Sequence, residues 1–145
     1  MKDNLPNQKR AILLYGEAGN GKTSIAWNYA KHSKFSYVKF ITPDNFIGLT
    51  DMQKVLQLSK IFENAYKTTS ACIVVDSIEK LVNYHPIGRR FSNSILQALL
   101  VFIDRKPVHE SSKLLIIGTS STYYDLKELE LVDRFDSKYF FLINL

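Results

Sequence analysis

Residues 16–23, GEAGNGKT, match the phosphate-binding pattern G-x-x-x-x-G-K-[ST] at every fixed position. The pattern stands between a strand-like run, 11–15, and a helix-like run, 24–32. Its glycines let backbone N–H groups turn inward around anionic oxygens at the positively polarised start of a helix. The sequence therefore predicts a loop that binds the phosphates of a nucleotide.

Two side chains of this loop have expected roles of their own. Lys22 would place a positive charge beside the β- and γ-phosphates of ATP, and the Thr23 hydroxyl would bind Mg²⁺. A second Mg²⁺ ligand is expected at Asp76, because it closes the apolar run 71–75 and ligands lie at the carboxyl ends of parallel strands. The predicted cofactors are thus ATP and Mg²⁺. The predicted nucleotide-binding residues are Gly16, Glu17, Ala18, Gly19, Asn20, Gly21, Lys22, Thr23 and Ser24.

The rest of the chain alternates strand-like with helix-like runs, which indicates a βαβ fold. Further strands are predicted at 36–41, 71–76, 113–118 and 138–143. Helices are predicted at 51–67, at 92–106 or 93–106, and from 122 onward. Asp51 is the expected N-cap of the first of these, and the spacing of Thr122 and Asp125 predicts a capping box. The helix after the loop should carry one apolar stripe, formed by Ile25, Ala26, Tyr29 and Ala30.

Composition limits the classes of protein to which the chain can belong. At 145 residues it has room for one domain. Its 19 Lys and Arg exceed its 14 Asp and Glu, but they are spread along the chain, which favours a solvated surface over nucleic-acid binding. The single cysteine, Cys72, permits no disulfide framework, and we find neither a membrane-spanning run nor a leader at Met1. We expect a cytoplasmic protein, at most peripheral to membranes.

Several stretches of the chain resemble the second ATPase domain of the NSF family of vesicle-fusing AAA+ ATPases. They are 73–81 (IVVDSIEKL), 86–93 (PIGRRFSN), 95–100 and 114–119. The resemblance implies a five-stranded parallel sheet in the order 5-1-4-3-2, within a three-layer α/β P-loop sandwich. It also implies a parent homo-hexamer that uses ATP to disassemble SNARE complexes, presented by SNAP adaptors, through its other domains. In this family the second domain mainly binds ATP to hold the hexamer together.

Three positions depart from the pattern of hydrolytically active members. Ser77 stands where a glutamate polarises the attacking water, and Ser121 stands where asparagine is usual. Of two arginines that reach a neighbouring subunit, Arg134 matches the second, whereas Leu131 replaces the first. The predicted catalytic positions are Asp76, Ser77, Ser121 and Arg134. We therefore expect tight Mg-ATP binding with slow hydrolysis.

Some residues keep two interpretations. Glu79 would supply the missing base if it shared a strand face with Ser77, but the strand is expected to end before it. Phe46 aligns with an aromatic residue that grips substrate in many AAA+ rings, or it packs against the following helix. Arg89 and Arg90 fit either a subunit contact or the solvated charge of a loop.

The alternative function is a hydrolytically active AAA+ domain that remodels another protein or a nucleic acid. A nucleotide kinase would need an Arg-rich lid and a GTPase an N-K-x-D motif, and we find neither. The resemblance also implies a small helical lid and an adenine-binding segment that these residues do not include. We therefore expect 1–145 to be the large AAA+ subdomain without its lid, a fragment of a larger ATPase.

Overall fold

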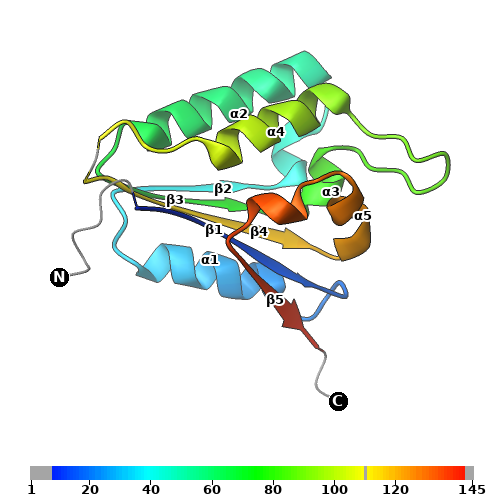
Figure 1. Cartoon of the computed structure of the whole chain (residues 1–145), viewed down its shortest axis with the longest axis horizontal. Helices are drawn as coiled ribbons and strands as arrows, with labels where there is room; N and C mark the ends of the chain where they lie inside the picture. The colour runs from blue at the N-terminus through cyan, green and yellow to red at the C-terminus, as the bar shows by residue number, and fades with distance from the viewer. Residues whose placement is uncertain (1–7, 110, 143–145) are drawn as a thin grey trace.

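A parallel sheet of five strands forms the centre of the molecule (Figure 1). The computed structural model describes residues 8–109 and 111–142. The strands are β1 (Gln8–Gly16), β2 (Tyr37–Ile41), β3 (Ser70–Val75), β4 (Lys113–Ser120) and β5 (Ser137–Phe141). They lie in the order β2-β3-β4-β1-β5, and all neighbours are parallel. Counted from the other edge, this is the order 5-1-4-3-2 that the resemblance implied, so the predicted fold class is confirmed.

Helices cover both faces of this sheet and give three layers (Figure 1). The α-helices are α1 (Lys22–His32), α2 (Asp51–Tyr66), α3 (Ile78–Leu81), α4 (Asn93–Asp104) and α5 (Tyr123–Glu128). The chain also forms two 3₁₀ helices, η2 (Pro43–Phe46) between β2 and α2 and η3 (Val132–Arg134) between α5 and β5. Of the described α-helices, α1 lies on one face and the other four lie on the opposite face. No helix among the described residues is long and apolar enough to cross a membrane.

Strand β3 shows how the sequence pattern produces this layering. Ala71, Ile73 and Val75 point into the larger apolar cluster on the α2 and α4 side. Cys72 and Val74, which alternate with them, belong to the smaller cluster beneath α1. A central strand covered on both faces needs apolar residues at every position, which explains the run without alternation.

The predicted apolar stripe on α1 is only half buried. Ala26 and Ala30 pack against the sheet, but Ile25 and Tyr29 are 51% and 53% exposed. Among the helices that the structure describes, α1 alone lies on this face, and those two side chains border an apolar groove with Tyr139.

The helix caps differ from the sequence prediction at two places. Thr50, not Asp51, is the N-cap of α2, and it forms a capping box with Gln53. Thr122 does precede α5, but its hydroxyl makes no capping bond, so the predicted box with Asp125 is wrong. The Asp125 carboxylate instead accepts a hydrogen bond from Tyr84.

The ends of several helices and strands also differ from the predicted ends by one or two residues. Helix α4 stops two residues before the predicted Lys106, because the backbone before Pro107 disfavours helical geometry and Arg105 is extended. Strand β4 continues two residues beyond the predicted Gly118, and β3 ends one residue before Asp76. Strand β5 ends at Phe141, and the predicted end at 143 lies outside the described residues.

Candidate functional site

The phosphate loop joins β1 to α1 and depends on backbone freedom at its glycines. Gly19 and Gly21 have φ of 84° and 91°, in the left-handed region that side chains disfavour. Gly16 has a different constraint: a Cβ there would lie 2.4 Å from the carbonyl oxygen of Phe141 in β5. The Asn20 amide donates to that same oxygen at 2.8 Å, so the loop is tied to the edge strand.

Lys22, the first residue of α1, folds its side chain back into the loop. It is only 7% exposed. Its Nζ donates to the carbonyl oxygens of Gly16 and Glu17, each at 2.7 Å, and to Asn20 Oδ1 at 3.1 Å. Burial lowers the pKa of the ammonium, whereas the carboxylates of Glu79 and Asp76 act in the opposite direction. The positive charge is therefore held inside the loop by neutral oxygens.

A hydrogen-bond network connects α1 to the carboxyl ends of β3 and β4. The hydroxyls of Thr23 and Thr119 both donate to Asp76 Oδ1, at 2.6 and 2.8 Å. Thr119 Oγ1 also accepts the backbone N–H of Ser77 at 2.8 Å. Three segments far apart in sequence thus meet at one carboxylate, as the strand-end argument predicted for Thr23 and Asp76.

These groups border a cavity of about 360 Å³. The loop lines one side, and the ends of β3 and β4 with the start of α3 line the other. The lining residues are Ala18, Gly19, Gly21, Lys22, Thr23, Ser24, Ser77, Glu79, Lys80, Thr119, Ser120 and Ser121. Of the predicted catalytic positions, Ser77 and Ser121 lie on the cavity and Asp76 is bonded to its wall. Arg134 is not among the lining residues.

The donor set at this cavity fits Mg²⁺ and a nucleotide phosphate. The Thr23 hydroxyl and the Asp76 carboxylate are hard oxygen donors held 2.6 Å apart. Mg²⁺ is usually bound by one or two protein oxygens together with phosphates and water, and these two side chains could supply the protein oxygens.

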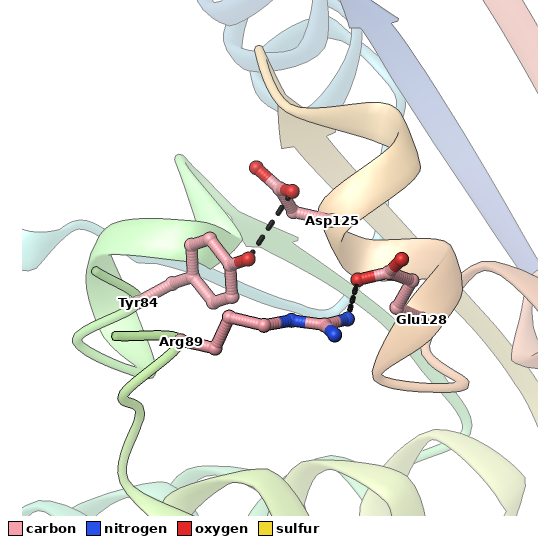
Figure 2. A network of polar contacts seen from close by, with 4 residues as sticks. All are labelled: Tyr84, Arg89, Asp125 and Glu128. Atoms are coloured by element: carbon pink, nitrogen blue, oxygen red, sulfur yellow. Dashed lines mark hydrogen bonds and ion pairs between the residues drawn. The ribbon is translucent and has the colours of Figure 1, made fainter. Parts of the chain in front are cut away.

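The predicted intersubunit arginine and the two loop arginines lie away from the cavity. Arg134 forms an ion pair with Asp104 at the end of α4. Figure 2 shows Arg89 paired with Glu128 of α5, beside the hydrogen bond from Tyr84 to Asp125. Arg90 is exposed, and its backbone bridges to that of His85.

The structure also bears on the interpretation of Phe46. Its ring is only 3% exposed and belongs to the larger core cluster. The next residue, Ile47, is 78% exposed. This placement supports the packing interpretation of Phe46 rather than a substrate-gripping one.

Two residues of the site were missed or left open by the sequence. Thr119 is buried and bridges Asp76 and Ser77. The only signal for it in the sequence was its place in the polar run 119–121, which follows the strand predicted at 113–118. Glu79 lies in α3, the single turn of helix that follows β3, which confirms the expectation that the strand ends before it. From there it lines the cavity and accepts bonds from Ser121.

A parallel sheet with a phosphate loop after β1, and an aspartate after β3 bonded to the loop threonine, defines the class of P-loop nucleoside triphosphatases. Residues 12–142 match the model of the AAA family, described as the ATPase family associated with various cellular activities. The chain belongs to this family of ATPases.

Curated relatives narrow the resemblance further. The chain is 42% identical over 127 residues to the vesicular-fusion protein SEC18 of Candida albicans, covering 88% of this chain and 16% of that protein. It is 42% identical over 125 residues to the vesicle-fusing ATPase of Dictyostelium discoideum, covering 86% and 17%. With the vesicle-fusing ATPase of Arabidopsis thaliana the identity is 40% over 123 residues, covering 85% and 16%. The chain thus matches about a sixth of each relative's length, the extent of one AAA domain.

Proposed function

We propose that the cavity binds Mg-ATP and hydrolyses it slowly, so that the nucleotide serves mainly as a ligand that stabilises an assembled state. One juxtaposition carries the proposal. The Thr23–Asp76 bond of 2.6 Å lies beside a complete phosphate loop, whereas Ser77 follows Asp76 directly. A serine hydroxyl cannot take a proton from water near neutral pH. The binding groups are therefore present, and the usual base is replaced.

Each group of the site has a role in this proposal. The loop N–H groups at the start of α1 would receive phosphate oxygens, and Lys22 would exchange its loop carbonyls for them. Thr23 and Asp76 would hold Mg²⁺, which supplies positive charge beside the phosphates when bound. Ser121 would hydrogen-bond water or phosphate with a shorter reach than asparagine.

We extend the proposal to the parent protein. The chain would be the second AAA+ domain of a cytoplasmic vesicle-fusing ATPase, peripheral to membranes. That protein would act as a homo-hexamer and disassemble SNARE complexes presented by SNAP adaptors. Support comes from the relatives named as vesicle-fusing ATPases and from the family resemblance of residues 73–81 and 86–93.

A calorimetric titration of this chain with Mg-ATP tests the binding part. We expect saturable binding that Lys22→Ala weakens by about 100-fold, because the variant loses charge-assisted bonds to phosphate. Thermal unfolding of the variant without nucleotide serves as the folding control. A wild-type chain that binds no Mg-ATP would contradict the proposal.

Two further measurements, of the ATP turnover rate and of the assembly state, test slow hydrolysis and the role of the nucleotide in assembly. A rate near 10 s⁻¹, ordinary for enzymes, would overturn slow hydrolysis. Sedimentation with and without Mg-ATP should show that the nucleotide shifts the chain toward larger species, since a ligand favours the state that binds it better. Identical sedimentation at saturating nucleotide would count against the assembly role.

A further inference from the structure

The cavity contains a carboxylate that the family pattern does not assign. Glu79 is only 8% exposed, and its side chain lines the cavity together with the phosphate loop. Its Oε2 accepts hydrogen bonds from Ser121, from the hydroxyl at 2.9 Å and from the backbone N–H at 3.3 Å. Helix α3, which begins directly after Ser77, turns Glu79 back toward the end of β4.

The other carboxylate oxygen of Glu79 lacks a partner. Oε1 is buried and makes no hydrogen bond to any residue that the structure describes. A buried carboxylate oxygen without a donor is costly, because it has lost its water and gained nothing in return. On the wall of a cavity suited to phosphates, the small donor that would satisfy it is a water molecule.

Charge and chemistry single out this residue among the described lining residues. Glu79 is the one acidic side chain that lines the cavity, whereas Ser77 and Ser121 offer only hydroxyls. Lys22 lines the same cavity; burial lowers the pKa of its ammonium, and the charge of Glu79 opposes that effect. The hydrogen bonds from Ser121 hold the carboxylate in place as an acceptor.

From these observations we infer that Glu79 is the general base for the slow hydrolysis of ATP at this site, in place of the glutamate that Ser77 replaces. The inference rests on the proposed function. The Glu79 carboxylate accepts a proton from water as the water oxygen bonds to the γ-phosphorus and the bond from that phosphorus to the β–γ bridging oxygen breaks. The proton then passes to solvent, and the products are ADP and inorganic phosphate.

Single-turnover hydrolysis of radiolabelled ATP by this chain tests the assignment. Glu79→Gln keeps the size and the acceptor for Ser121 but cannot take a proton, so the rate should fall about 100-fold or more. Glu79→Asp should retain a measurable part of the rate. The affinity for a non-hydrolysable ATP analogue should change less than about threefold in both variants, and thermal unfolding should show that both fold.

Glu79→Gln separates the two possible roles of this residue, because its amide oxygen still accepts the bond from Ser121 but cannot take a proton. If Glu79 acts only by holding Ser121, Glu79→Gln will keep its rate within about threefold of wild type, which overturns the inference. Wild-type turnover too slow to detect also overturns it. Failure of wild type to bind the analogue would instead remove the proposed function itself.

Discussion

The phosphate loop and the strand ends opposite it are built on different principles. The loop is one contiguous segment whose shape depends on its backbone, with Gly19 and Gly21 at positive φ and Lys22 bonded to loop carbonyls. The strand ends are assembled from side chains, where Thr119 bridges Asp76 and Ser77. Few substitutions preserve the first, whereas a side chain can change in the second without disturbing the sheet. A change of side chain at the strand ends therefore need not alter the loop.

Gly16→Ala should have the largest effect on stability, because it disrupts the phosphate loop. The new Cβ would meet Phe141 O at 2.4 Å and Asn20 Nδ2 at 2.9 Å, at a φ of 145°. We expect the free energy of unfolding to fall by about 3 kcal/mol, measured by urea denaturation. Gly19→Ala is the control, because its Cβ would have nothing within 4 Å and it should cost only about 1 kcal/mol of backbone strain. Equal losses in the two variants would show that the clash between a Cβ at position 16 and Phe141 of β5 does not contribute to the loss of stability.

Ser77→Glu tests the strand ends, because it supplies the usual catalytic base at the position after Asp76. We expect ATP turnover to rise by about 100-fold, which corresponds to about 2.7 kcal/mol in the barrier, with little change in Mg-ATP affinity. Ser77→Gln, which has the same size but no base, is the matched control. A rise in both variants would mean that the side chain acts by changing the cavity and not by accepting a proton.

Thr119→Val tests whether the strand ends need their hydroxyl bridge. The Ser77 N–H and the Asp76 carboxylate would each lose a buried partner, so we expect a loss of about 2 kcal/mol in the free energy of unfolding. Thr119→Ser keeps the hydroxyl and should retain most of the stability. If both variants lose the same amount, the methyl group matters and the bridge does not.

Arg89→Ala should have the smallest effect and sets the scale for contacts outside the site. Its ion pair with Glu128 is exposed to solvent (Figure 2). We expect urea denaturation to show no change beyond experimental error, because exposed pairs are screened and lose side-chain entropy. A measurable loss that Glu128→Gln reproduces would show that the pair anchors the 84–91 loop to α5.

The sequence predicted the loop better than the strand ends for a physical reason. Residues 16–23 carry their geometry in adjacent positions, so a pattern suffices to recognise them. The contacts of Glu79 depend on where α3 turns after β3, over a distance of more than forty residues to Ser121. Nothing local in the sequence specifies such a contact.

Cap errors and the half-exposed helix have similar causes. Thr50 and Asp51 are both good N-caps, and the reciprocal bonds with Gln53 decided between them. The stripe on α1 was correctly identified as apolar, but periodicity does not reveal how much of a sheet face one helix covers. Ile25 stays exposed because it borders the groove beside α1 and does not pack into the core beneath it.

The buried Cys72 thiol offers a way to measure local opening of the folded chain. Its side chain is buried beneath α1, and burial raises the pKa of the thiol from 9.0 to about 12. Alkylating reagents react with the thiolate, which is scarce and inaccessible while the sheet is covered. The rate at which such a reagent labels the native chain therefore measures how often the layer between α1 and β3 opens, without an engineered cysteine.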